Sequence, residues 1–354
     1  MNRVKILSVL LLPAILFAQK NNQSIVGVKL HYGSIFIHTP SVKNVAGSKP
    51  FGTELEFSRQ PTDTLSFNKC NCFPRNGVAF SYFNFDTHIL GHGFMLSYFL
   101  EPSYKLNKNL LLNVRGAAGL GYFSNPYNAI KNPENKSYTT HINPYLQAGI
   151  GIGYNLNKKL RLLLMGSFQH FSNGAYKEPN RGVNWITGSI GMLYFSQNTL
   201  LPSYAHIPRK SIINKKINVD AGILFVPQQG YNSKIMAQSK LIAGAFIQAT
   251  KQYGRISAFT AGIEAYYNKI KKQTAEESKW IAGIHAGHAF LFGRVTFSQQ
   301  LGYNIYNQTA GTTDKFYLRY GLLYRITNHL IAGINLKAHA DNADFTDFRI
   351  MYRF

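Results

Sequence analysis

Apolar and polar side chains alternate with a period of two along most of the chain. This alternation is typical of β-strands with one apolar face and one polar or small face. Short turns such as Asn107-Lys108 separate some segments, and longer polar stretches such as 125–139 separate others. We expect about 14–16 strands. The predicted strands are 24–38, 52–59, 77–85, 89–106, 109–124, 140–156, 159–172, 183–197, 216–226, 240–252, 255–268, 280–292, 295–305, 316–326, 329–339 and 345–354.

The last ten residues, FTDFRIMYRF, show the alternation most clearly. One face of this predicted strand is apolar and carries Phe348, Ile350, Tyr352 and Phe354. The opposite face is mostly charged and carries Asp347, Arg349, Met351 and Arg353. One face therefore suits lipid and the other a polar interior. A terminal aromatic residue in this pattern resembles the assembly signal of bacterial outer-membrane barrels.

Composition supports a membrane barrel. Charged residues make up only 15% of the chain, below the soluble-protein average of roughly 25%. Beyond the N-terminal segment no run of 18 apolar residues occurs, which excludes helical membrane spans. A β-barrel explains both the low charge content and the lack of long apolar runs, because its alternating strands are never continuously apolar. We therefore predict an all-β protein, a transmembrane antiparallel β-barrel of the bacterial outer membrane, with a soluble sandwich as the alternative.

The sequence is compatible with two domain organisations. We favour one wide barrel over 19–354. The segment 198–215 contains two prolines and a basic cluster, and it predicts the alternative of two eight-stranded barrels joined by a linker. On either reading 216–354 supplies additional strands of unassigned function.

The N-terminus, MNRVKILSVLLLPAILFAQK, has the features of a secretory signal peptide. Arg3 and Lys5 precede a short apolar core that ends near the predicted cleavage site after Ala18. We assign 1–18 to this signal, with a buried N-terminal helix as the alternative. An exported chain of net charge +23 is expected to meet anionic lipid head groups rather than nucleic acid.

Two neighbouring predicted strands bring polar groups to one apolar face. Along 159–172, the outward positions are apolar until His170 and Ser172. Residues two apart on a strand share a face, so an imidazole can reach the hydroxyl and activate it. If 183–197 pairs with this strand as a hairpin, Asn184 joins the same face. Polar groups on a lipid-facing surface are costly unless they lie at the interface or have a function; an interfacial polar belt is the simpler alternative.

The stretch HFSNGAYKEPNRGVN resembles the signature of the lipid A 3-O-deacylase (PagL) family. The matching residues are His170, Ser172, Asn173, Pro179, Asn180 and Gly182. The resemblance covers 140–197 most clearly and extends over 24–197. It implies an outer-membrane barrel that removes an ester-linked acyl chain from lipid A. It also implies that Ser172 is the nucleophile, His170 the general base and Asn173 an oxyanion-stabilising group.

One position departs from the family. Asn184 stands where the family has a glutamate. An asparagine can orient the histidine by accepting its N–H, as in Cys-His-Asn enzymes, but it contributes no charge. Glu178 in the adjoining turn is an alternative acid. Lys177 and Arg181 flank the turn and are expected to pair with lipid phosphates, unless they simply belong to a solvated loop.

The sequence thus predicts an esterase that acts on lipid A, or on a related glycolipid of the lipopolysaccharide layer, through Ser172, His170 and Asn184. It implies no cofactor and no metal, because Cys70 and Cys72 lack a ligating histidine nearby. Two alternatives remain: a porin-like channel, in which interior arginines such as Arg161 and Arg349 would favour anions, and a catalytically inactive structural barrel. The oligomeric state is not indicated.

Overall fold

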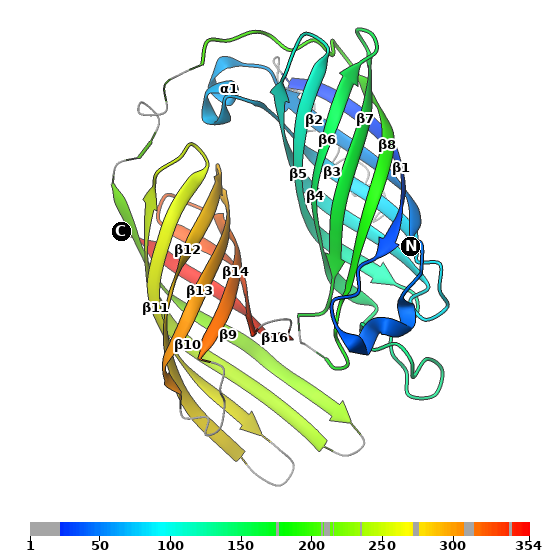
Figure 1. Ribbon diagram of the computed structural model, residues 1–354. Coiled ribbons are helices and arrows are strands. Elements are labelled where there is room, and N and C mark those ends of the chain that lie inside the picture. Colours follow the sequence, from blue (N-terminus) through cyan, green and yellow to red (C-terminus); the bar gives the residue numbers. More distant parts are fainter. Residues whose placement is uncertain are drawn as a thin grey trace, which may run out of the picture.

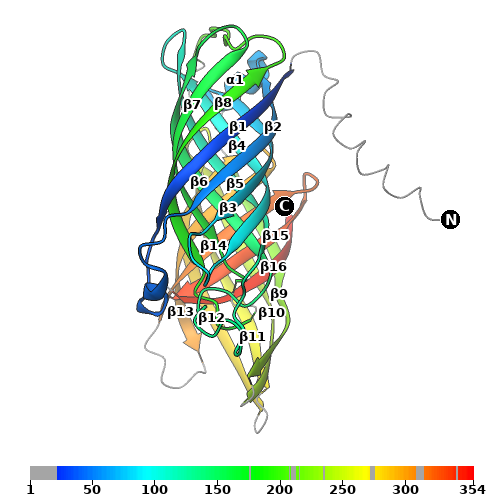
Figure 2. The ribbon, with the colours of Figure 1, turned by 90° about the vertical axis from the view of Figure 1, so that its right-hand side faces the viewer.

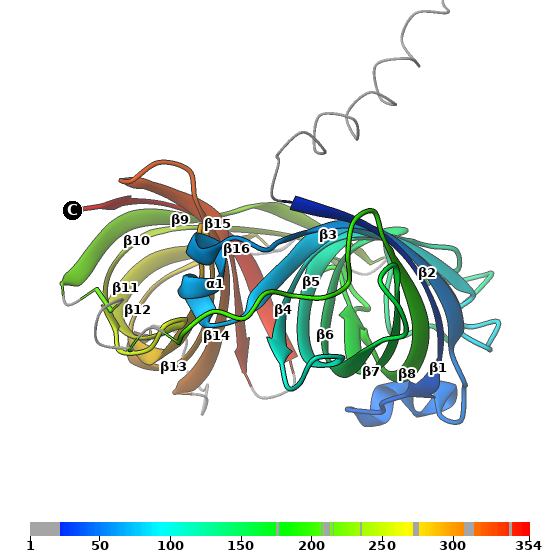
Figure 3. The same cartoon turned by 90° about the horizontal axis from the view of Figure 1, so that it is seen from above.

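The structure, a computed structural model, contains two closed eight-stranded antiparallel β-barrels (Figures 1 and 3). It describes residues 22–174, 177–206, 208, 213–214, 216–233, 236–271, 276–307, 315–339 and 342–354. The predicted signal peptide, 1–18, lies outside these residues. Among the described residues, no helix has the length and apolar character needed to cross a membrane.

The first barrel contains strands β1 to β8 and two short helices. Its strands are β1 (Asn22–Ile35), β2 (Phe51–Pro61), β3 (Phe73–Asn84), β4 (His92–Lys105), β5 (Leu110–Phe123), β6 (Ile142–Asn155), β7 (Leu160–Phe171) and β8 (Val183–Phe195). A 3₁₀ helix, η2 (Pro40–Val45), follows β1, and α1 (Thr64–Cys70) follows β2. Asp63 caps α1 by accepting the Ser66 N–H at 2.9 Å. Cys70 at the end of α1 forms a disulfide with Cys72.

The second barrel contains the remaining strands. They are β9 (Ile217–Ser233), β10 (Met236–Gln252), β11 (Ser257–Lys271), β12 (Glu276–Phe292), β13 (Val295–Asn307), β14 (Phe316–Arg325), β15 (Leu330–His339) and β16 (Asn342–Arg353). Each of the sixteen strands corresponds to one predicted from the sequence.

The alternation of the sequence becomes an apolar exterior and a polar interior. On β1, Val28 and Leu30 are 51% and 57% exposed, whereas the intervening Lys29 is 1% exposed. The last strand repeats this pattern, with Phe348 and Ile350 outside and Arg349 buried inside. An apolar outer surface of this extent is the face that a membrane barrel presents to lipid.

The prediction of one wide barrel was wrong, because the chain forms the alternative, two eight-stranded barrels. β8 pairs with β1, for example Phe195 with Ile25, which closes the first barrel. β16 pairs with β9, for example Phe348 with Phe225, which closes the second. An eight-stranded barrel has an interior just wide enough for side chains to fill. Among the side chains that the structure describes, buried residues occupy the middle of both interiors, which a wide barrel would not require.

Buried ion pairs fill the middle of each barrel. In the first barrel the network has three acidic and three basic side chains: Glu54, Glu56, Glu101, Lys29, Arg75 and Arg115. In the second barrel Arg319 lies 2.6 Å from Glu264 and 2.5 Å from Asp347, and both acids also pair with Arg349. Pairing of this kind lets charges occupy a dry interior. The middle of each barrel is therefore occupied by described side chains rather than open like a porin lumen.

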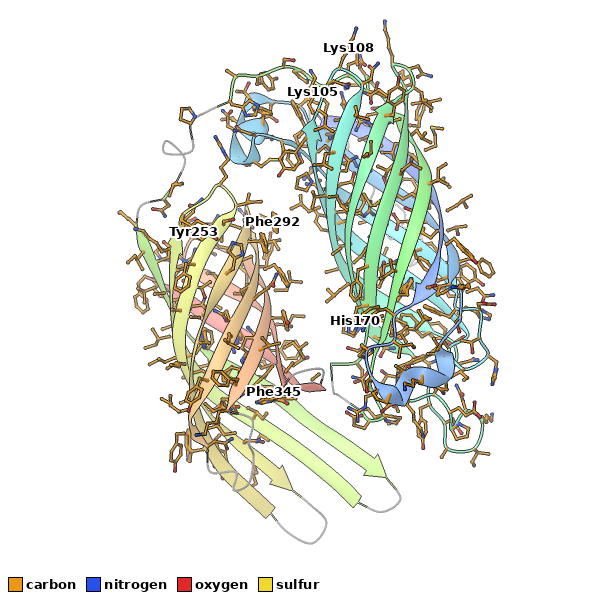
Figure 4. All side chains as sticks on the ribbon, viewed as in Figure 1. Lys105, Lys108, His170, Tyr253, Phe292 and Phe345 are labelled. Carbon is orange, nitrogen blue, oxygen red and sulfur yellow. A yellow bond between two sulfur atoms is a disulfide. The ribbon has the colours of Figure 1, made fainter. Side chains whose placement is uncertain are left out.

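The two ends of the first barrel differ. Short turns such as 106–109 lie at the end that carries α1, and longer loops such as 124–141 and 172–182 lie at the opposite end. The tilted strands connect these ends (Figure 2). Lys105 and Lys108 mark the short-turn end, and His170 lies toward the other end (Figure 4). His170 therefore belongs to the long-loop end of the first barrel.

Candidate active site

The hairpin of β7 and β8 sets the positions of the predicted catalytic residues. His170 is directly paired with Asn184 in the register of the two strands. Their neighbours, Phe171 and Trp185, point to the interior, where both are fully buried in an aromatic cluster. Because side chains alternate along a strand, this inward anchoring turns His170 and Asn184 outward together.

Three side chains form a continuous hydrogen-bonded series. The Nε2 atom of His170 lies 3.1 Å from Ser172 Oγ, and its Nδ1 atom lies 2.6 Å from Asn184 Oδ1. An amide oxygen can only accept, so His170 carries its proton on Nδ1 and leaves the Nε2 lone pair for the serine hydroxyl. This is the protonation state that a general base requires.

Glu178, the alternative acid, does not contact His170 in this arrangement. Its carboxylate accepts the Asn180 backbone N–H at 2.8 Å, within the loop. The Nδ1 side of His170 is occupied by Asn184 instead. Asn184, and not Glu178, is therefore the residue that meets the histidine.

A fourth residue, His38, was not anticipated from the sequence. Its Nδ1 atom lies 2.9 Å from Asn184 Nδ2, and its Nε2 atom lies 2.8 Å from the Arg181 carbonyl oxygen. His38 follows β1, and the Phe36 N–H donates to the Asn184 carbonyl at 2.8 Å, which extends the pairing of β1 with β8. Closure of the first barrel thus brings His38 to the site.

The loop after β7 is braced by the long loop between β5 and β6. The backbone N–H groups of Arg181 and Gly182 donate to the carbonyls of Lys136 and Ser137 at 3.1 and 2.7 Å. The Tyr138 hydroxyl is buried and donates to a backbone carbonyl at 2.7 Å. Burial raises the pKa of Tyr138, so this hydroxyl remains a donor. The bracing fixes the loop against the barrel.

Gly182, in the Pro-Asn-x-Gly part of the motif, leaves room for the His170 ring. Its φ is +71°, a conformation that favours glycine, and a Cβ atom there would lie 2.8 Å from His170 Cε1. A larger residue would therefore strain the turn and displace the imidazole.

The loop also contains the candidate oxyanion donors. The Gly174 N–H points to Ser172 Oγ at 3.4 Å. The Asn173 amide donates to the Lys177 carbonyl at 2.7 Å, and its backbone N–H donates to Asn180 Oδ1 at 2.9 Å. Asn173 therefore organises the loop, and one side-chain N–H of its amide is engaged within it. From the second barrel, Thr346 Oγ1 lies 3.4 Å from the Gly174 carbonyl oxygen.

The surroundings of the site combine charge and apolar surface. Lys177 and Arg181 are exposed on the loop. On the outer surface next to His170, Phe168 and Ile186 are 42% and 49% exposed, and Phe36 packs edge-on against Phe168 at 6.4 Å between ring centroids. The site therefore lies where an apolar outer wall meets a basic loop.

Comparison with solved structures returns outer-membrane barrels with weak similarity. Neisserial surface protein A is 9% identical, covering 48% of this chain and 96% of its own, with a TM-score of 0.34. The beta domain of the Bordetella autotransporter BrkA is 8% identical, covering 95% and 99%, with a TM-score of 0.26. An outer-membrane channel from Pseudomonas putida F1 is 11% identical, covering 95% of each chain, with a TM-score of 0.22. No curated protein sequence matches the chain.

Family models give a stronger result. The model of lipid A 3-O-deacylase (PagL) matches residues 67–193, which include His170, Ser172 and Asn184. The model of the acyloxyacyl hydrolase C-terminal domain matches residues 216–354, the part to which the sequence analysis assigned no function. The two matches follow the division into two barrels and together cover most of the chain. The chain therefore belongs to the lipid A 3-O-deacylase (PagL) family.

Proposed function

We propose that this protein is an esterase that removes an ester-linked acyl chain from lipid A, with Ser172 as its nucleophile. Family membership makes it an outer-membrane protein of the lipid A deacylase class. The observation that supports the serine mechanism best is the series of hydrogen bonds from Ser172 through His170 to Asn184. A nucleophile, a base and a group that orients the base are the parts that such catalysis requires.

In the proposed reaction, Ser172 Oγ attacks the ester carbonyl carbon while its proton passes to His170 Nε2. The tetrahedral intermediate then collapses. The sugar hydroxyl leaves with the proton from His170, and the acyl chain remains on Ser172. Water, deprotonated by the same histidine, attacks the acyl-enzyme and releases the fatty acid. Asn184 Oδ1 accepts from the imidazolium throughout, as a dipole rather than as a charge.

The oxyanion of each intermediate needs hydrogen-bond donors. We assign this role to the Gly174 N–H, together with Asn173, the residue that the family resemblance indicates. The Gly174 N–H already lies 3.4 Å from Ser172 Oγ, next to the atom that would attack the ester. A single oxyanion donor contributes about 10²–10³-fold to kcat in serine hydrolases.

The position of the site suits a substrate held in the membrane. An acyl chain lying along the outer wall near Phe168 and Ile186 would present its ester at the level of Ser172. The phosphorylated sugar would then meet the basic loop. Lateral entry from the outer leaflet fits this arrangement, because the catalytic side chains face outward and not into the barrel.

We expect alanine substitution of Lys177 or Arg181 to raise KM by about 2–5-fold with little change in kcat, since an exposed ion pair contributes only weakly. The effect should disappear on lipid A from which the phosphates have been removed, because the proposed partners are those phosphates. Steady-state kinetics on the two substrates measures this. The control is Lys158→Ala, an exposed lysine in a turn at the other end of the barrel; an equal KM increase there would contradict a local role.

Asn184 gives a second prediction. Asn184→Ala should slow hydrolysis by about 10-fold, because the imidazole loses a hydrogen bond that holds its orientation. Asn184→Glu should hydrolyse lipid A at least as fast as the parent. The acidic limb of its pH–rate profile should move to higher pH, because a carboxylate favours the protonated imidazole. If Asn184→Ala matches the parent, Asn184 does not orient the base.

The channel alternative predicts ion conductance. The ion-pair networks occupy the interiors of both barrels, which favours a closed lumen. The inactive-barrel alternative predicts no chemistry at all. Release of free fatty acid from purified lipid A by the folded protein, with Ser172→Ala as the control, distinguishes these alternatives from an esterase.

A further inference from the structure

His38 lies behind the catalytic series and extends it to the backbone. Asn184 Nδ2 contacts His38 Nδ1 at 2.9 Å, and His38 Nε2 contacts the Arg181 carbonyl oxygen at 2.8 Å. The carbonyl can only accept, so His38 carries its proton on Nε2. Asn184 Nδ2 can only donate, so His38 Nδ1 accepts from it. Every hydrogen bond from Arg181 to Ser172 therefore has a defined direction.

That direction matters because an asparagine amide has two unlike ends. With Oδ1 toward His170, the ring is protonated on Nδ1 and Nε2 is free to accept the serine proton. With the amide rotated by 180°, Nδ2 would face His170 and donate to Nδ1. The ring proton would then sit on Nε2, and the base would be lost. A glutamate at this position would accept from His170 Nδ1 in either orientation, because both of its oxygens are acceptors.

We propose that His38 is a positioning residue that fixes the amide orientation of Asn184 and thereby keeps His170 in its basic tautomer. The inference rests on the proposed function, since it gives His38 a part in the same reaction. His38 does not touch Ser172; it acts through Asn184. Asn184, which stands where the resemblance implies a glutamate, thus has His38 on the far side of its amide to fix its orientation.

The first test measures the tautomer directly and does not depend on activity. Nitrogen-15 NMR of the detergent-solubilised, folded protein reports which ring nitrogen of His170 is protonated. The chain has 11 histidines, so the His170 signals are assigned by their loss in His170→Gln. We expect protonation on Nδ1 in the parent and a mixture of tautomers in His38→Ala. A His170 that stays protonated on Nδ1 alone in His38→Ala would overturn the proposal.

The second test uses the difference between an amide and a carboxylate. In the parent, His38→Ala should lower kcat by about 10-fold, the usual effect of one lost hydrogen bond, and leave KM unchanged. In Asn184→Glu, the same substitution should change kcat by less than about 2-fold, because a carboxylate has no orientation to fix. An equal loss in both backgrounds would mean that His38 only supports the loop.

His38→Gln separates positioning from folding. Its amide oxygen can accept from Asn184, so it should restore kcat above that of His38→Ala. No rescue in a protein that retains its heat-modifiable folded band would contradict the proposal. If the parent hydrolyses no ester, the proposed function fails while the NMR experiment still decides the role of His38.

Discussion

Ser172→Ala is expected to lower ester hydrolysis by about 10³-fold or more, and His170→Ala by a similar factor, since removing a member of a catalytic unit has effects of this size. Without Ser172 no acyl-enzyme forms. Without His170 the hydroxyl keeps its proton, because His170 Nε2, at 3.1 Å, is the base that would take it. Both side chains face outward from the barrel wall, so both variants should fold. Fatty-acid release from purified lipid A measures the loss.

The rate of the double variant, Ser172→Ala with His170→Ala, tests whether the two residues act together. Because Ser172 and His170 act on the same proton, the double variant should be about as slow as either single variant. Ser172→Thr is a useful comparison, since it retains a hydroxyl but adds a methyl group at the point of attack. Folded Ser172→Ala protein that hydrolyses lipid A at the parental rate would rule out this nucleophile.

Arg115→Ala is expected to destabilise the first barrel by about 3–5 kcal/mol, the usual cost of breaking a buried ion pair by removing one partner. Arg115 is 1% exposed and contacts Glu54, Glu56 and Glu101 at 2.9, 2.8 and 3.2 Å. Its removal leaves the three buried carboxylates with Lys29 and Arg75 as the remaining basic partners of the network. The temperature at which the folded band is lost in gel electrophoresis should fall sharply.

Lys158→Ala is the matched control, because it removes a cation of the same barrel that is exposed in a short turn. It should leave the transition unchanged, as exposed charges contribute about 0–1 kcal/mol. If Arg115→Ala and Lys158→Ala unfold at the same temperature, the interior network does not stabilise the barrel. If Arg115→Ala yields no folded protein while Lys158→Ala folds normally, the result agrees with the prediction.

The local part of the structure was predictable from the sequence. Alternation depends on neighbouring residues, so it identified the sixteen strands and the face that each side chain occupies. The same alternation, with a hairpin between β7 and β8, correctly brought Asn184 beside His170. Recognition of the short motif singled out the residues that form the hydrogen-bonded series. Each of these inferences needs only a few consecutive residues or one hairpin.

Barrel closure was not predictable, because it joins strands that are distant in the sequence. A strand that pairs with β1 looks the same whether it is β8 or β16, and the linker at 198–215 was the one sequence feature that indicated two barrels. Closure also decides whether His38 meets Asn184, since these residues are 146 positions apart. The preference for one wide barrel left no reason to place them together.

Mass spectrometry of lipid A shows whether this chain deacylates lipid A through Ser172. Lipid A is isolated from cells that express the parent, from cells that express Ser172→Ala at the same folded level in the outer membrane, and from cells with neither. We expect a species lighter by one ester-linked acyl chain with the parent and unchanged lipid A in the other two samples. Unchanged lipid A with the folded parent protein, or the same lighter species with Ser172→Ala, would contradict it.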